Sequence, residues 1–124
     1  EVQITGDDGN VLYHNGAWDA ETGYILGQED VAWEPHHDVV ENSDQVVIYE
    51  LVLGDVNGDP TTVLERAHEH LKDNRMVPRG FSSDHVVYDT TAVVGNALTD
   101  PNFNLDSEGL EGSGTDQVTY LLPE

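Results

Sequence analysis

The sequence contains no cysteine, and this absence excludes several kinds of site at once. Without thiols the chain forms no disulfide, no thiolate metal site and no Cys-x-x-Cys-His attachment for a covalent haem. It also lacks any run of about 18 apolar residues, the length that a membrane-spanning helix needs. We therefore expect no covalently bound haem and no membrane span.

Positive charge is the next scarce feature. Four Lys and Arg stand against 25 Asp and Glu, which gives a formal net charge of −21. Binding to a nucleic-acid backbone needs clustered cations, so a nucleic-acid partner is excluded. The same charge disfavours an anionic membrane surface as a partner. So many carboxylates on one small chain resemble the surface of a salt-adapted, halophilic-like protein.

The 124 residues fit one domain, and we expect a single acidic β-rich domain over residues 1–124. Alternating or β-branched patterns predict strands at residues 1–5 and 10–13, joined by a turn at 6–9. Further strands are predicted within 45–53, 85–94 and 118–122. The polar, Gly-rich stretch 100–114 is expected to be a long loop.

One helix is predicted over about residues 60–72. Asp59 is a good capping residue, Pro60 suits the first helical position, and apolar residues follow at helical spacing. Asp55 to Asp59 fails the calcium-loop pattern of an EF-hand and is expected to be a plain turn. The fold class expected is mainly β, a β-sandwich-like antiparallel domain with this one short inserted α-helix.

All four basic residues fall within one short segment of this acidic chain: Arg66, Lys72, Arg75 and Arg79. One interpretation is that they pair with carboxylates and fix the predicted helix to the sheet. The other is that they form a local site for an anion, a haem propionate or the carboxylates of a partner.

The segment Trp33 to Asp38 concentrates further usable groups. His36 and His37 are followed by a carboxylate, so a metal or haem ligand with an orienting partner is one interpretation. Hydrogen bonding within a loop is the other. The acids and amides of residues 100–108 form an oxygen-rich stretch, which makes Ca²⁺ a candidate ion, whereas no metal-ligand set can be assigned from spacing.

No catalytic motif is present. The serines lack the G-x-S-x-G elbow of hydrolases, and 25 acids make some carboxylate pair inevitable, so a pair carries no information. We therefore name no catalytic residue and expect a non-enzymatic domain.

Several stretches resemble the C-terminal, haem-free domain of bacterial multihaem c-type cytochromes. The most specific is Lys72-Asp73-Asn74-Arg75 with Pro78 and Gly80-Phe81. Others are Glu34-Pro35-His36, residues 44–50, Gly54-Asp55, Thr61-Thr62, Leu64, Arg66-Ala67, residues 94–97, Asp100, Phe103 and residues 114–120. The resemblance covers nearly the whole chain.

The resemblance implies a periplasmic or extracellular setting and a role in electron transfer. In that family a haem-binding region precedes this domain, so the chain is expected to be a C-terminal fragment or processed chain of a larger protein. It would be a non-catalytic accessory or docking domain, and its partner a haem-bearing cytochrome chain or domain. In that setting His36 is a candidate axial ligand to a haem held in trans.

A second function from a different class stays open. Trp18, Tyr24 and Trp33 would suit an extracellular module that stacks on a carbohydrate or another surface polymer.

Overall fold

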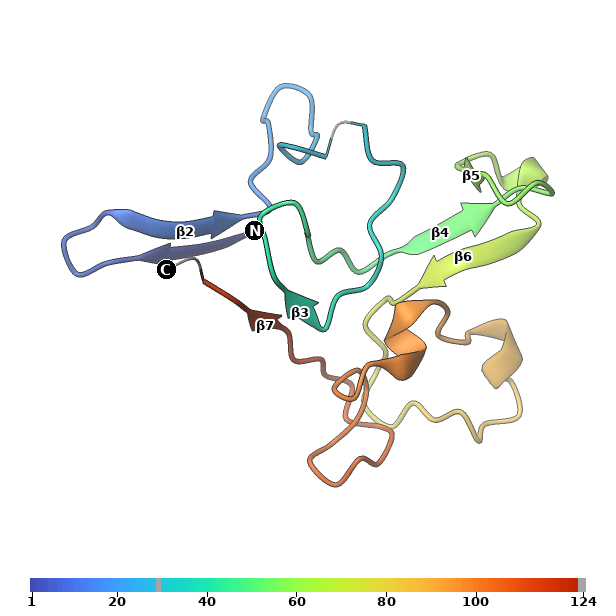
Figure 1. Ribbon diagram of the computed structural model, residues 1–124. Helices are drawn as coiled ribbons and strands as arrows, with labels where there is room; N and C mark the ends of the chain where they lie inside the picture. The colour runs from blue at the N-terminus through green and yellow to red at the C-terminus, as the bar shows by residue number, and fades with distance from the viewer. Residues whose placement is uncertain (29, 123–124) are drawn as a thin grey trace.

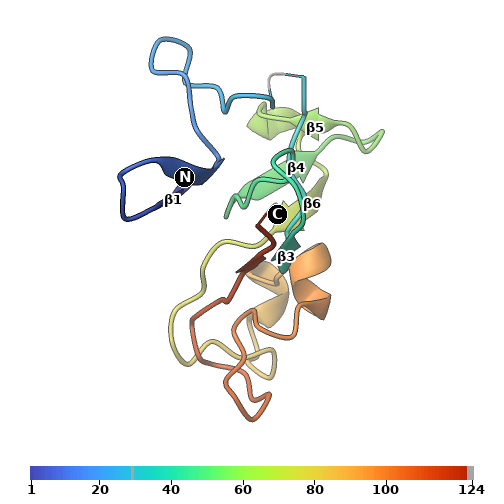
Figure 2. The ribbon, with the colours of Figure 1, turned by 60° about the vertical axis from the view of Figure 1, so that its left-hand side comes forward.

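The computed structural model describes residues 1–28 and 30–122. Within these ranges seven short strands form three small sheets. In Figure 1 the sheet of β1 and β2 and the sheet of β4, β5 and β6 extend to opposite sides, with β3 and β7 between them, and Figure 2 gives a second view. The described residues contain no α-helix, only three 3-10 turns: η1 (Leu64–Arg66), η2 (Tyr88–Thr90) and η3 (Asn96–Thr99). In this part of the chain no helix is long and apolar enough to cross a membrane. The mainly-β expectation holds at this coarse level.

The first sheet is the predicted N-terminal hairpin. β1 (Val2–Thr5) pairs antiparallel with β2 (Val11–Asn15), and the pairing passes over Leu12 between Ile4–Tyr13 and Thr5–Val11, which marks a bulge of one residue. The turn closes because the amide of Gly9 donates to the carbonyl of Gly6 at 2.9 Å, with Gly9 at a φ of 80°. That φ suits glycine, which explains the Gly-Asp-Asp-Gly sequence of the turn.

The second sheet has three strands in the order β5-β4-β6: β4 (Leu51–Gly54), β5 (Pro60–Thr61) and β6 (Glu69–Asp73). β4 and β5 are joined by the turn at Asp55, as expected. The Asp55 carboxylate accepts hydrogen bonds from the amides of Asn57 and Asp59, so it organises the turn itself.

The helix predicted over residues 60–72 is wrong. In its place lie β5, η1 and β6. The run Thr61-Thr62-Val63 is β-branched, and β-branched side chains favour extended backbone. β6 then pairs along β4, from Leu51 opposite Asp73 to Gly54 opposite Glu69. This pairing outweighs the apolar spacing that suggested a helix.

The remaining pair is parallel. β3 (Val39–Val40) lies beside β7 (Thr119–Tyr120), which ties the middle of the chain to its C-terminal part. The strand predicted within 85–94 is replaced by η2 and by one bridge between Val94 and Asp73. The three sheets of the described residues are small, and one of them is parallel, so they do not by themselves establish two facing antiparallel layers. The two-layer antiparallel sandwich therefore remains a prediction.

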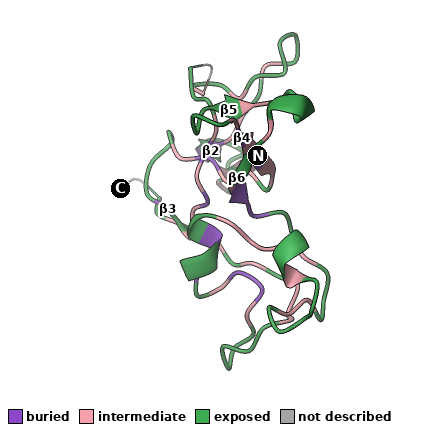
Figure 3. Ribbon diagram, turned by 90° about the vertical axis from the view of Figure 1, so that its right-hand side faces the viewer, coloured by how far each residue is buried: buried purple, intermediate pink, exposed green. Residues whose placement is uncertain are grey.

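The hydrophobic core is small. Six apolar residues are buried: Tyr13, Val40, Val46, Val52, Ala97 and Phe103. Buried residues occupy only short stretches of the ribbon in Figure 3. The accessible surface is 8573 Å², whereas a compact monomer of 13.6 kDa exposes roughly 6,600 Å². About 2,000 Å² of additional surface is therefore exposed.

Candidate functional site

His36 is a buried polar residue, and its side chain is 1% exposed. It lies in coil ahead of β3, and its ring packs edge-on against Phe103, with the centroids 5.4 Å apart. Its Nε2 lies 2.7 Å from Oδ2 of Asp100, and its Nδ1 lies 2.9 Å from the side-chain amide nitrogen of Asn74. Both ring nitrogens are therefore hydrogen-bonded inside the protein.

Asn74 determines the tautomer of this histidine. Its Oδ1 accepts from the amide of Glu50 at 2.8 Å, and its Nδ2 donates to the carbonyl of Ile48 at 2.9 Å. These two bonds fix which end of the amide is the donor, so Nδ2 donates its other hydrogen to Nδ1 of His36. Nε2 then carries the ring hydrogen and donates to Asp100.

A second buried carboxylate completes this centre. Oδ2 of Asp116 lies 3.9 Å from Nε2 of His36 and accepts the hydroxyl of Tyr49 at 2.7 Å. Burial, followed by this bond to a carboxylate, raises the pKa of Tyr49 well above its usual range. The phenol therefore stays protonated and acts as a donor.

Among the residues that the structure describes, His36, Asp100 and Asp116 form the one group with ligand atoms close enough to share a metal ion. Their donor atoms lie within 4.8 Å of one another. A metal on Nε2 would need the ring hydrogen on Nδ1, where it would meet the amide hydrogens of Asn74. The hydrogen-bond directions therefore fit a protonated Nε2 better than a metal ligand.

The same geometry bears on haem ligation. As an axial ligand in trans, His36 would have to give up its bond to Asp100 and reach the surface. In this conformation the imidazole is an interior group that joins four distant segments through Asn74, Asp100, Asp116 and the ring of Phe103. His37, its neighbour, lies 3.1 Å from a carboxylate oxygen of Glu34.

The four basic residues do not form one cluster. Lys72 is 1% exposed, and its Nζ donates to the carbonyls of Glu34 and Ile48 at 2.5 and 2.8 Å. It also lies 3.2 Å from a carboxylate oxygen of Glu50. Burial lowers the pKa of Lys72, and the bond to Glu50 partly opposes that shift. Lys72 is thus bonded within the protein and does not face a partner.

Arg75 and Arg79 follow β6 and remain accessible. Arg75 donates from Nε and one terminal nitrogen to the buried carboxylate of Asp73, at 2.8 and 2.7 Å. This pair raises the pKa of Arg75. Within the described chain, no carboxylate lies in ion-pair reach of Arg79 or Arg66. Arg66 lies on η1, at the opposite end of β6.

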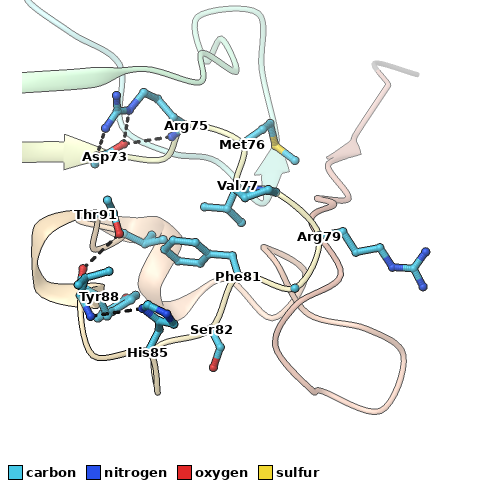
Figure 4. A pocket seen from close by; sticks show the side chains of 14 residues that line it. Asp73, Arg75, Met76, Val77, Arg79, Phe81, Ser82, His85, Tyr88 and Thr91 are labelled. Carbon is cyan, nitrogen blue, oxygen red and sulfur yellow. Dashed lines mark hydrogen bonds and ion pairs between the residues drawn. The ribbon is translucent and has the colours of Figure 1, made fainter.

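Beside Arg75 and Arg79 lies an open hollow of about 670 Å³, which we call the 75–93 hollow. Figure 4 shows the ring of Phe81 beside Tyr88 and His85, three of the residues that line the hollow. Its wall is mostly apolar, formed by Met76, Val77, Phe81, Val87, Tyr88 and Val93. A hollow of this size is large enough for a small ligand or for a side-chain anchor of a partner.

The oxygen-rich stretch 100–108 is not drawn together into a cation site. Asp100 bonds to His36, Asn104 bonds to the carbonyl of Phe81 and the amide of Gly114, and Asp106 accepts from two nearby amides. These groups organise the loop and hold it against residues 78–81. They do not converge on one point.

Sequence reasoning missed the partners of His36 and the 75–93 hollow. Asn74 and Asp100 lie 38 and 64 residues from His36, so no local spacing could join them. The burial of three consecutive polar side chains, Lys72, Asp73 and Asn74, becomes visible only in the structure, and their residue types gave no signal of it. Three buried polar residues in a row need interior partners.

No family model, curated protein or solved structure matches this chain.

Proposed function

We propose that the chain is a non-catalytic accessory domain, periplasmic or extracellular, that docks on a haem-bearing electron-transfer partner. The proposal that the chain docks on a partner rests on its large accessible surface, 8573 Å², which surrounds only six buried apolar residues. A chain of this kind gains stability by covering apolar surface on a partner. The resemblance to the haem-free cytochrome domain, most specific at Lys72-Asp73-Asn74-Arg75 with Pro78 and Gly80-Phe81, supports the identity of that partner.

The exposed apolar side chains are distributed in a way that favours docking. Leu12 on β2 is 63% exposed, and Leu121 and Leu122 after β7 are each about half exposed. β2 and β7 meet through Tyr13 and Tyr120, whose ring centroids are 6.1 Å apart. Exposed apolar side chains on two segments that are in contact are typical of a surface that another chain covers.

The interior histidine fits a supporting role. The bonds of His36, Asn74 and Lys72 tie together the segments at 34–36, 48–50, 72–74 and 100. They hold the shape of the domain, whereas none of these side chains reaches the surface to react with a substrate.

Gentle purification from the native source tests the proposal. We expect the chain to elute in size-exclusion chromatography with a component that shows a Soret band. Urea denaturation of the separated chain should show a lower midpoint than that of the complex, because binding stabilises the folded state. A colourless, stable monomer that neither gains stability from nor elutes with a haem protein would contradict the proposal.

One turn favours a second candidate, carbohydrate binding. Trp18 and Tyr24 are 57% and 60% exposed, and the bridge between Trp18 and Ile25 holds both on one short turn. Two exposed aromatic rings on one turn can stack on sugar rings. Binding to a glycan array that Trp18→Ala abolishes would support this alternative, and absence of binding would exclude it.

A further inference from the structure

The 75–93 hollow differs in character from the rest of this acidic chain. Its lining is mostly apolar, with Pro78 beside the six residues named above, and Phe81 and Tyr88 lie with ring centroids 5.8 Å apart. The hollow has a volume of about 670 Å³, within the usual range of small-molecule sites. Aromatic and aliphatic walls of this kind favour a flat or aromatic ligand.

The charged side chains that line this hollow are Asp73, Arg75 and Arg79. Asp73 and Arg75 form a two-point pair and cancel each other. Arg79 has no carboxylate partner in the described chain, so the lining keeps one uncompensated positive charge. On a protein of net charge −21, this is a place where an anion is attracted and not repelled.

His85 adds a hydrogen-bond donor. Its Nδ1 accepts the amide of Val87 at 3.4 Å, which leaves the ring hydrogen on Nε2 when the ring is neutral. Figure 4 shows His85 beside the Tyr88 and Phe81 rings, while the Arg79 side chain extends outward from the border of the hollow. Because no partner holds Arg79, its long side chain is free to turn toward a bound anion.

We propose that the 75–93 hollow is a binding site for a small aromatic ligand that carries one anionic group. The ring system lies against Phe81, Tyr88 and Val93, and the anion is neutralised by Arg79 with the Nε2 hydrogen of His85 as a second donor. This site does not depend on the haem-bearing partner, and the partner's absence would leave it intact.

The test uses the full chain and two defined probes. One is the anionic dye 8-anilinonaphthalene-1-sulfonate and the other is uncharged N-phenyl-1-naphthylamine, which shares the ring system. We expect saturable binding of the sulfonate at one site, at least as tight as that of the neutral dye. On a chain of charge −21 without a local cation, the sulfonate would bind more weakly than the neutral dye.

Two matched pairs of variants locate the site. Val87 lines the hollow and is 52% exposed, whereas Val86 next to it is 94% exposed and lies outside. Val87→Asp should weaken sulfonate binding at least tenfold, and Val86→Asp should leave it nearly unchanged. Arg79→Gln should weaken it about tenfold or more, the loss of one charged hydrogen bond. Arg66→Gln removes the same charge at a position outside the hollow and should have little effect.

All four positions are exposed, so the variants are expected to keep the fold, and circular dichroism checks this. Tighter binding of the neutral dye, equal loss in Val86→Asp and Val87→Asp, or equal loss in Arg66→Gln and Arg79→Gln would each overturn the proposal. Binding of several dyes without saturation would do so as well, because it would show a general apolar surface and not a site.

Discussion

The side-chain amide of Asn74 donates to Nδ1 of His36 and thereby places the ring hydrogen on Nε2, where Asp100 accepts it. The two further bonds of Asn74, to Glu50 and Ile48, prevent the amide from turning round. A single buried asparagine thus decides the chemical form of the buried histidine.

The tautomer can be measured directly. Long-range ¹H–¹⁵N NMR spectra near neutral pH should show Nδ1 of His36 as an unprotonated acceptor and Nε2 as protonated. In Asn74→Asp the donor is lost while the shape is kept, so the variant should unfold at lower urea and lose the single defined tautomer. A protonated Nδ1 in the native protein would contradict the assignment.

Replacement of Lys72 by Met tests its interior role. The carbonyl of Glu34 loses its Lys72 donor, the carbonyl of Ile48 keeps only that of Asn74, and the carboxylate of Glu50 loses its cation. We therefore expect a loss of about 3 kcal/mol in the free energy of unfolding. Arg66→Met removes a cation from an exposed position and should change stability by less than about 0.5 kcal/mol. Equal effects in urea titrations would show that Lys72 is not bonded as described.

The raised pKa of Tyr49 predicts a loss of stability in alkali. The folded phenol keeps its proton while the unfolded phenol, with a pKa near 10.0, loses it, so the contribution of Tyr49 is complete below that pH and declines above it. The lowered pKa of Lys72 has the opposite effect on stability. Between its folded pKa and about 10.5 the unfolded chain holds the Lys72 proton more tightly than the folded chain, so the free energy of unfolding rises with pH in that range.

The Lys72 effect is common to the native protein and to Tyr49→Phe, so it cancels in their comparison. Between about pH 9 and pH 11 the native protein should lose more stability than Tyr49→Phe, because only the native protein loses the Tyr49 contribution. Urea titrations across this range measure the difference. Parallel pH profiles would contradict the role given to the Tyr49–Asp116 bond.

Two glycines with positive φ allow the cost of a strained backbone conformation to be measured apart from the cost of a steric clash. An added Cβ at Gly109 meets nothing within 4 Å, whereas at Gly114 it would lie 2.7 Å from the amide nitrogen of Arg79. Gly109→Ala should therefore cost about 1 kcal/mol for the left-handed conformation alone. Gly114→Ala should cost about 2 kcal/mol more, because backbone must move. Similar losses in thermal melts would show that residues 79 and 114 are not in close contact.

The charge imbalance predicts a salt effect. With 25 acids and four bases, the folded chain carries strong self-repulsion that salt screens. The midpoint of thermal unfolding should rise between about 10 mM and 500 mM NaCl, the lower limit corresponding to a Debye length of about 30 Å. A flat or falling midpoint would contradict the view of a salt-adapted surface.

The sequence predicts local features of this fold well. The hairpin of β1 and β2 follows from alternation around a turn with two glycines, and the Asp55 turn follows from its Asx pattern. The helix over residues 60–72 was predicted from spacing that a paired strand also satisfies in part, and pairing with β4 decided between the two. Propensity over one short segment cannot report a distant partner strand.

The candidate site was less predictable for the same physical reason. The sequence drew attention to His36 and to Arg75 and Arg79, but it could not separate the buried Lys72 from the accessible arginines. Burial depends on which distant segments come together. The polar run Lys72-Asp73-Asn74 gave no sign of its interior position, because polar residues in a row are typical of a surface.

The connections that surround His36 also have a kinetic meaning. They join residue 36 to residues 74, 100 and 116, and β3 to β7, so the stabilising contacts lie far apart along the chain. Domains dominated by such contacts have high contact order and fold slowly, since long loops must close before any contact forms. During that interval the apolar strands remain exposed, so the strong negative charge would also protect the unfolded chain from self-association.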